Sequence, residues 1–392
     1  MKILFTTIFE YPHAGGLSTH ISTLKKGLEE RGHQVDVLSF SDFNPVKRKV
    51  YAQAPGFFLN IIHKGKGQVL NDQRRKNLLV TYLKERKQHY DVINSQDIFA
   101  TMASIECGLP TVSTVHGYYS FEAISRGSIQ EHSDEDQYIQ KQEKIAYKVA
   151  TDVVSVDRRI SNYIKKLSNR EVTIVKNFID IEDFNPARQR YSDIKTEYSI
   201  PEHHKILFVP RRLTEKNGVK YPLLALNQVL AVHPDTTLVY AGEGEQLANL
   251  KKLSMSEGVA DHIKLLGAVP HEKMKYLFEV ADIVLVPSVH SHGVEEATSI
   301  SALEAMGSGS PVIAGAVGGL KEIISHETDG ILVEEKNVNA LAQWINHLLA
   351  QPQKGKQLAQ NARKKIEREY SHHFAAKKFE SIYKNAVTSY KV

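Results

Sequence analysis

Two glutamates separated by seven residues could bind the hydroxyl groups of a sugar. Glu296 and Glu304 lie in the sequence PSVHSHGVEEATSISALEAMGSG, and Glu304 falls in a segment with helical periodicity that ends at a glycine. We expect Glu296 in the loop before this helix, where Thr298, Ser299 and Ile300 would offer free backbone amides to a phosphate. Taken alone, the pattern also fits an exposed Glu296 and a Glu304 that only caps the helix or forms a salt link.

Three cations follow the apolar run at residues 206–209. Arg211, Arg212 and Lys216 lie in the sequence VPRRLTEKNG, just beyond the end of a predicted strand. Cations at the carboxyl edge of a sheet suit a diphosphate leaving group, whose negative charge grows in the transition state. The alternative is a solvated basic loop.

A glycine turn separates the first apolar run from the first helical pattern. Gly15 and Gly16 stand in the sequence YPHAGGLST, and a helix is expected from about Leu17. Backbone amides at a helix N-terminus attract phosphate, and glycine lets the phosphate come close. The fingerprint G-x-G-x-x-G is absent here, which argues against a dehydrogenase. A glycine turn without a ligand is the alternative.

Histidines and acidic residues raise the question of a metal. His116 ends a predicted strand in the sequence TVHG and is expected to project from the sheet edge into a cleft, with a structural role as the alternative. His290 and His292 could imitate a metal site, but no third ligand has convincing spacing. Residues 134–136 have the D-x-D form but lie in a polar stretch, which we interpret as a solvated helix start. We therefore expect no metal site.

Short apolar runs alternate with helical patterns along the whole chain. The predicted strands are residues 2–7, 34–40, 90–94, 111–115, 152–156, 206–209, 237–241, 262–266, 283–287, 311–314 and 330–333. Strands alternating with helices imply parallel pairing through right-handed crossovers. The sequence predicts an α/β fold of two facing Rossmann-like domains with a cleft between them, where the carboxyl edges of the sheets bind ligands. The expected domains are residues 1–178 and 179–368, with a terminal helix at 369–392 that returns to the first domain.

The composition is that of a soluble globular protein. The 392 residues are 42% apolar and 24% charged, carry a net charge of +5 and include one cysteine, Cys107. No stretch reaches the ~18 uncharged apolar residues that a membrane span needs, and the N-terminus lacks a signal-peptide cleavage pattern. We expect a cytoplasmic protein.

The positive charge is concentrated between residues 45 and 90. Only Asp72 and Glu85 oppose eleven basic residues there: Lys47, Arg48, Lys49, Lys64, Lys66, Arg74, Arg75, Lys76, Lys84, Arg86 and Lys87. Apolar residues at helical spacing predict an amphipathic helix over 72–88, and residues 57–62 add an apolar segment. This region is either an ordinary surface helix packed on the core, or it binds an anionic acceptor or the inner face of an anionic membrane. Nucleic acid is not expected, because no base-reading motif accompanies the charge.

Together these motifs resemble the retaining GT-B glycosyltransferases of family four, the group 1 type. The resemblance covers nearly the whole chain in the right order: GGLSTH, TVHG, a linker VKNFID, an R-x4-K element, AGEGEQL, KLLGAVPHEKM, E-x7-E running into ALEAMGSGSPVIA, GGLKEII and DGILV. Two departures stand out. Residues 297–299 read ATS where many members have Gly-Phe-Gly, and the linker has Lys176 and Phe178 where Pro and Gly are usual.

The resemblance implies a role for each candidate residue. Arg211 and Lys216 would hold the donor diphosphate, helped by the turn at Gly15 and Gly16, and the amides of residues 298–300 would also face the donor. Glu304 would bind ribose hydroxyls, Glu296 would bind the donor sugar and stabilise oxocarbenium charge, and His116 would contact the sugar near the reacting carbon. No metal or other cofactor would be needed. Retention would follow from attack on the same face that the diphosphate leaves.

The predicted function is transfer of a hexosyl or N-acetylhexosaminyl group from a nucleotide-sugar, with a UDP-sugar favoured. The acceptor would be a sugar, a lipid-linked molecule or a small molecule, in the biosynthesis of a cell-surface glycan, glycolipid or glycoside. A nucleotide-sugar epimerase of similar fold is one alternative, although no additional acid/base carboxylate stands out. A nucleotide-sugar-binding protein without turnover is another, and the presence of all five candidate side chains argues against it.

Overall fold

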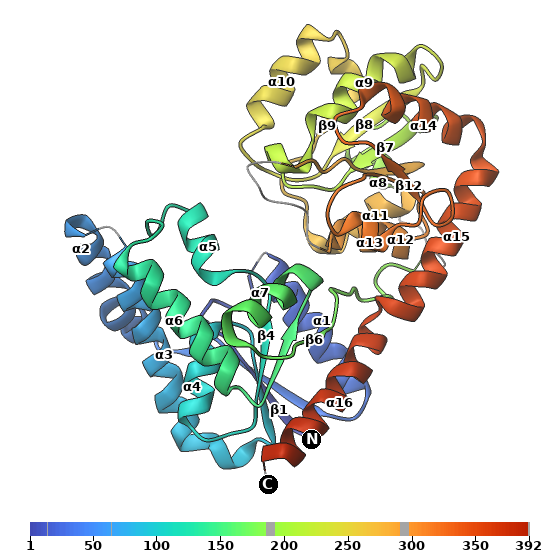
Figure 1. Ribbon diagram of the computed structural model, residues 1–392. Coiled ribbons are helices and arrows are strands. Elements are labelled where there is room, and N and C mark those ends of the chain that lie inside the picture. The colour runs from blue at the N-terminus through green and yellow to red at the C-terminus, as the bar shows by residue number, and fades with distance from the viewer. Residues whose placement is uncertain (14, 64, 186–192, 291–297, 391–392) are drawn as a thin grey trace. The chain divides into compact units, whose positions relative to one another are not determined.

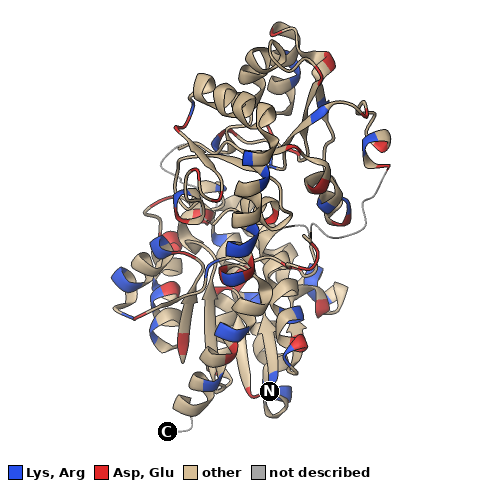
Figure 2. Ribbon diagram, turned by 90° about the vertical axis from the view of Figure 1, so that its right-hand side faces the viewer, with Lys and Arg blue, Asp and Glu red and all other residues tan. Residues whose placement is uncertain are grey.

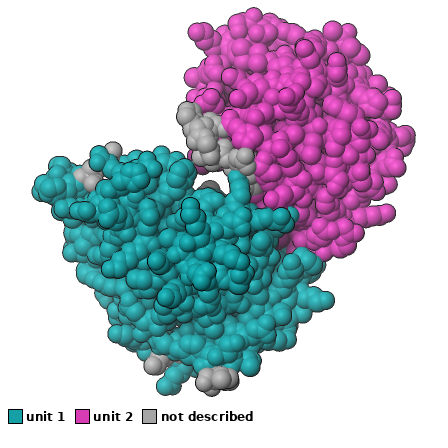
Figure 3. Space-filling view, in the orientation of Figure 1, with its two compact units in different colours: residues 1–177, 372–392 teal, residues 178–371 magenta. Residues whose placement is uncertain are grey.

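The computed structural model describes residues 1–13, 15–63, 65–185, 193–290 and 298–390 (Figure 1). The chain forms two compact units, residues 1–177 with 372–392 and residues 178–371, coloured separately in Figure 3. No helix in the described segments is long and apolar enough to cross a bilayer.

The first unit is built on a parallel sheet of six strands. These are β1 (Lys2–Thr6), β2 (Gln34–Leu38), β3 (Val92–Ser95), β4 (Thr111–Val115), β5 (Asp152–Ser155) and β6 (Thr173–Ile174), in the order β2-β1-β3-β4-β5-β6. The helices are α1 (Gly16–Glu30), α2 (Ala54–Ile62), α3 (Lys66–Arg86), α4 (Ile98–Glu106), α5 (Tyr119–Ser125), α6 (Asp134–Val149), α7 (Arg158–Ser168) and α16 (His372–Tyr390). All residues of β3 and β4 are buried, as expected for parallel strands covered on both faces.

The second unit repeats this architecture. Its strands are β7 (Lys205–Val209), β8 (Thr236–Tyr240), β9 (Ile263–Leu265), β10 (Ile283–Val286), β11 (Val312–Gly315) and β12 (Ile331–Val333), in the order β12-β11-β10-β7-β8-β9. The helices are α8 (Ile194–Glu197), α9 (Lys220–Leu230), α10 (Leu247–Ser256), α11 (His271–Val280), α12 (Ile300–Gly307), α13 (Leu320–Ile323), α14 (Val338–Ala350) and α15 (Pro352–Glu369). The prediction of two α/β units with parallel sheets is confirmed.

The chain passes out of the first unit at Asn177 and returns to it at His372. Inside the second unit the outgoing and returning segments lie side by side, because Ile179 N donates to Tyr370 O over 3.0 Å. In the first unit, α16 then packs on α1 at Gly27, where an added Cβ would lie only 2.7 Å from His372 O. At the other end of α16, Tyr383 OH accepts a 2.6 Å hydrogen bond from the buried Asn94 amide of β3.

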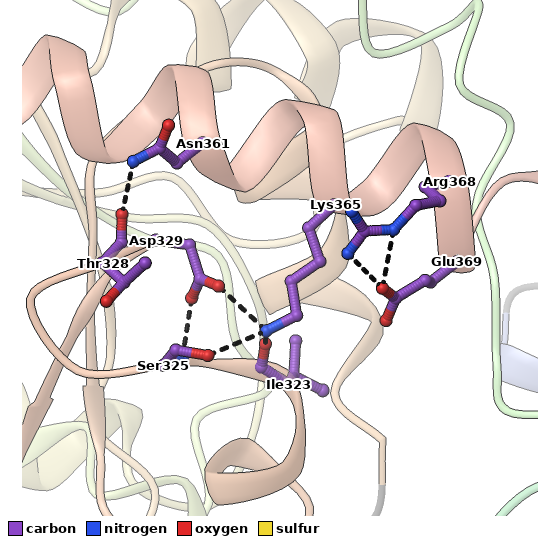
Figure 4. Close-up of polar contacts among 8 residues, drawn as sticks. All are labelled: Ile323, Ser325, Thr328, Asp329, Asn361, Lys365, Arg368 and Glu369. Atoms are coloured by element: carbon purple, nitrogen blue, oxygen red, sulfur yellow. Dashed lines mark hydrogen bonds and ion pairs between the residues drawn. The ribbon is translucent and has the colours of Figure 1, made fainter.

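A partly buried ion pair fixes α15 on the second unit (Figure 4). Lys365 Nζ lies 2.9 Å from Asp329 Oδ2, and Asp329 Oδ1 accepts a 2.7 Å bond from Ser325 N. One helical turn earlier, Asn361 Nδ2 donates to Thr328 O. The Asp329 carboxylate of the DGILV motif is therefore committed to the turn before β12 and to α15.

Candidate functional site

The candidate residues of the second unit gather around the ends of β7 and β10. These two strands are neighbours at the centre of the sheet, and the strand order reverses between them. In open α/β sheets the loops at such a reversal diverge and leave room for a ligand. The loop after β7 carries Arg211 and Lys216, and α12 follows the segment after β10.

Arg211 joins these two loops. The residue is 7% exposed, and its guanidinium donates from Nη1 to Ser299 Oγ and from Nη2 to Asn217 Oδ1, each over 2.6 Å. Asn217 in turn donates to Arg212 O over 2.7 Å, while the Arg212 side chain is exposed. The structure thus places Arg211, and not Arg212, against the start of α12.

Lys216 lies in a short 3-10 helix, Glu215–Asn217. Its carbonyl oxygen accepts a 2.9 Å bond from Val289 N, which ties the β7 loop to the segment after β10. Its side chain is exposed and has no hydrogen-bond or ion-pair partner within the described residues. The ammonium group is therefore available to a ligand at this edge.

Three glycines let the loops come this close. An added Cβ at Gly218, whose φ is +62°, would lie 1.9 Å from Pro287 O. At Gly242 and Gly244, in the loop after β8, the clash would be with the carbonyl oxygens of Arg211 and Leu213, at 2.1 and 2.3 Å. A side chain at any of these positions would displace the backbone that carries Arg211.

The start of α12 presents the residues that the sequence analysis selected. Thr298 and Ser299 are buried, and Ser299 occupies the N-cap position without capping the helix with its own hydroxyl, which contacts Arg211 instead. Ser301 Oγ makes a second link to the β7 loop, donating to Pro210 O over 2.8 Å. The first turn of α12, including Ile300, therefore lies next to a buried arginine, an arrangement that suits an anion. Glu296 lies outside the described residues, as does His292.

Glu304 is a buried carboxyl group without a hydrogen-bond donor among the described residues. It is 7% exposed on α12, and burial raises its pKa to about 8. No hydrogen bond or ion pair reaches its side chain from the described part of the chain. A buried acceptor without a donor is costly, and hydroxyl groups of a ligand would satisfy it.

The first unit has a cavity of about 250 Å³ at the carboxyl edge of its sheet. It lies beyond β1, β3 and β4, and one wall is α5. The residues that line it are Phe9, His13, Leu17, Gln96, Asp97, Ile98, Ser113, Thr114, Val115, His116, Gly117, Tyr119, Glu122, Arg126 and Tyr147. His116, at the end of β4, is thus one of the residues that line this cavity.

His116 is held as a neutral imidazole. Burial lowers its pKa to about 4, and His20 of α1 packs edge-on against it with ring centroids 4.6 Å apart. Its Nε2 lies 2.8 Å from Gln96 Oε1, so the ring donates this proton to the amide oxygen. The buried Gln96 Nε2 has no hydrogen-bond partner among the described atoms.

Two residues of this cavity were missed by the sequence analysis. Asp97 joins the ends of β1 and β3, since its carboxylate accepts 2.8 Å bonds from Ile8 N and Ala100 N. Glu122 lies so close to Gly117 that an added Cβ there would be 1.8 Å from its Oε1. The signals were present: Asp97 stands at the N-cap of a helix after a buried strand, and Glu122 follows TVHG by five residues.

Gly15 and Gly16 form the turn into α1. Gly15 is the N-cap residue with φ 156° and ψ 163°, and no side chain caps this helix end. The sequence analysis placed the helix start at about Leu17, and the helix begins at Gly16. The turn lies in the same β1–α1 connection as His13, which lines the cavity.

The D-x-D pattern at residues 134–136 has a structural role. It forms the first turn of α6, capped by Ser133. Asp136 is buried and accepts 2.8 Å bonds from His132 N and Gln140 Nε2. The predicted helix start is confirmed, but the prediction that it is solvated is wrong for Asp136, which is buried.

The basic region of residues 45–90 also differs from the expectation. The helix predicted over 72–88 is found as α3 at Lys66–Arg86, and it buries Leu79 and Leu83. Asp72 is fully buried, and burial raises its pKa to about 6. Arg74 donates to Tyr51 O, and Lys76 pairs with Glu106. Several charges of α3 are therefore used by the fold, and across both units basic and acidic residues are interspersed (Figure 2).

Two family models match the chain. The model described as "Glycosyl transferases group 1" matches residues 191–365, and that described as "Glycosyltransferase Family 4" matches residues 14–183. An "Uncharacterized glycosyltransferase" of Methanocaldococcus jannaschii is 29% identical over 99% of each chain.

Solved structures share the fold. A sucrose-phosphate synthase from Thermosynechococcus elongatus superposes with a TM-score of 0.73 at 19% identity, over 99% of each chain. The Anabaena protein HepE, in complex with UDP-glucose, superposes with a TM-score of 0.68 at 20% identity, over 97% of this chain and 99% of HepE.

Proposed function

The chain belongs to the group 1, family 4 glycosyltransferases and has their GT-B fold, and on this premise we propose that it transfers a hexosyl or N-acetylhexosaminyl group with retention of the anomeric configuration. The proposed donor is a UDP-sugar, in line with the UDP-glucose complex of HepE, which has the same fold. The proposed acceptor is a sugar, a lipid-linked molecule or a small molecule, and the product is a cell-surface glycan, glycolipid or glycoside.

The observation that carries this proposal is that α12 brings a hydrogen-bond acceptor, Glu304, near a buried cation, Arg211. Glu304 is buried without a donor in the described structure, so it suits the hydroxyl groups of a ribose. At the start of the same helix, Ser299 holds the buried Arg211, which suits a diphosphate. Ser299 and Glu304 lie about one and a half helical turns apart along α12, which fits the ribose and diphosphate of one nucleotide.

The proposed reaction exchanges one bond at the anomeric carbon. The bond from this carbon to a diphosphate oxygen breaks, and a bond to an acceptor hydroxyl oxygen forms on the same face. The hydroxyl proton passes to the departing diphosphate, so no covalent sugar–enzyme bond is required. Arg211 and Lys216 would stabilise the charge that grows on the leaving group, and Glu296 would stabilise the oxocarbenium charge.

The cavity of the first unit is the proposed acceptor site. Its neutral His116 would contact the reacting sugar, and the Glu122 carboxylate beside Gly117 would accept a hydrogen bond from an acceptor hydroxyl. Arg126 is exposed on the same wall, where it would suit an acceptor that carries negative charge.

A donor screen followed by a transfer assay tests the proposal. A bound nucleotide-sugar raises the unfolding temperature by mass action, which selects the donor. That donor, labelled in its sugar, is then incubated with and without cell extract, and proton NMR of the product reports the anomeric configuration. An epimerase would convert the nucleotide-sugar without extract, a binding protein would leave it intact, and an inverted product would contradict retention.

A further inference from the structure

A stripe of large apolar side chains is exposed along one helical stretch of the first unit. It runs through the π-helical segment Lys47–Gln53 and continues into α2. Val46 and Val50 stand four residues apart, and in α2 Phe57 and Phe58 stand four residues before Ile61 and Ile62, so these four residues share one side of α2. Their exposed fractions are Val46 66%, Val50 65%, Phe57 66%, Phe58 63%, Ile61 71% and Ile62 73%.

The opposite side of this helix is made of small residues. Ala52 and Gly56 are buried, and an added Cβ at Gly56 would lie 2.4 Å from Gly67 O of α3. An added Cβ at Gly67 would lie 1.9 Å from Gly56 O. The two helices therefore approach closely at these glycines, where the side chains of Asn60 and Asn71 also pack, and a larger residue at either glycine would clash. A helix that buries its smallest residues and exposes its largest ones marks an interaction surface.

The charge around the stripe is positive. Residues 43–71 contain no aspartate or glutamate, and Lys47, Lys49 and Lys66 are exposed, with no ion-pair partner in the described structure. Acidic side chains approach at both ends, since Glu10 lies 3.7 Å from Arg48 and Gly65 packs against Glu135. Lys47 and Lys49, on either side of Arg48, are the lysines at the start of the stripe.

We propose that this stripe docks on the anionic surface of a lipid bilayer, with Phe57, Phe58 and Ile61 in the interfacial region and Lys47 and Lys49 at the headgroups. An apolar helical face flanked by lysines is the pattern of helices that lie in a membrane interface, and anionic headgroups attract such lysines. Self-association through this face would bring two positively charged surfaces together and is disfavoured. The surface uses no residue of the donor site, so docking stands apart from the proposed reaction. Combined with that reaction, it favours a lipid-linked acceptor.

The test is co-sedimentation of the whole protein with vesicles, without donor or acceptor. We expect the protein to bind vesicles that contain phosphatidylglycerol, to stay in the supernatant with pure phosphatidylcholine, and to dissociate as salt rises. Replacing Phe57, Phe58 and Ile61 by Ser should lower the partition coefficient about tenfold or more. Replacing Lys47 and Lys49 by Gln should lower it about tenfold to thirtyfold. Because all five side chains are exposed, the unfolding temperature should not fall.

Matched variants control for general loss of surface apolarity and charge. One replaces three exposed apolar residues elsewhere, Val149, Val232 and Met255, by Ser, and another replaces the exposed Lys144 and Lys148 of α6 by Gln. Both should bind as the unmodified protein does. Absence of binding to anionic vesicles, or equal losses in test and control variants, would overturn the proposal. So would a dimer in light scattering that the Phe57/Phe58/Ile61 variant converts to a monomer, since the stripe would then join two copies.

Discussion

Nucleotide binding should release a proton from Glu304. Burial raises the pKa of this carboxyl from its usual 4.5 to about 8 in the free protein, so at pH 7 about nine-tenths of the molecules hold it protonated. Ribose hydroxyls donate hydrogen bonds to the ionised form and lower its pKa. Binding at pH 7 should therefore release about 0.9 proton from this group, about one at pH 6 and about 0.1 at pH 9. The bound state holds fewer protons, so affinity should rise with pH and level off above about pH 8.

Titration calorimetry in buffers of different ionisation enthalpy measures this proton. The ligand is the nucleoside diphosphate of the donor found in the screen, and the matched variant is Glu304→Gln. Protons from the ligand's own phosphate occur with both proteins and cancel in the difference. A second control is the 2′-deoxy diphosphate, which offers one hydroxyl fewer. Equal proton release by both proteins would refute the assignment of Glu304 to the ribose.

The same variant has a second readout without ligand. The pKa of Glu304 is higher in the folded state than in the unfolded state, so the native state holds more protons between pH 4.5 and about 8. Glu304 therefore lowers the free energy of unfolding progressively as pH rises through this range. At pH 7 the cost is up to about 3 kcal/mol. Glu304→Gln should thus raise the unfolding temperature of the second unit by several degrees at pH 8 and by little at pH 5. A destabilised variant would mean that the carboxylate already has a partner.

Three further outcomes follow from the sites. Arg211→Ala and Lys216→Ala should each lower kcat about 10²-fold or more, whereas Arg212→Ala, at an exposed side chain, should change it little; unchanged kinetics in both of the first two would contradict the diphosphate assignment. Activity should persist in excess EDTA, because the cations of the β7 loop neutralise the leaving group, and complete loss restored by Mn²⁺ or Mg²⁺ would disprove this. His116 has a folded pKa of about 4 against 6.5 unfolded, so its contribution to stability is present above pH 6.5 and is lost as pH falls toward 4. Urea unfolding of His116→Gln should show a weaker acid destabilisation, and an unchanged pH dependence would mean that His116 is not buried as a neutral ring.

The sequence predicts the sheets well because each strand is a short apolar run bounded by polar turns. Lys205–Val209 and Thr111–Val115 needed no long-range information to be found. The family, too, could be identified from motif order. The partners of charged side chains were harder to predict. Arg74 and Lys76 counted as free surface charge, yet their partners Tyr51 and Glu106 lie more than twenty residues away along the chain. Local composition does not contain such pairings.

The helix at residues 47–62 shows the same limit most clearly. Its apolar residues, taken alone, could face the core or be exposed beside the basic charges. The side that packs is chosen by Gly56 and Gly67, whose missing side chains allow α2 and α3 to touch. The proposed donor site shows the same dependence on glycine, since Gly218 and Gly242 let neighbouring loops carry Arg211 to α12. In both places, glycines decide which groups are exposed or brought together, because they let two segments approach closely. Such an approach depends on both segments, so neither segment alone predicts it.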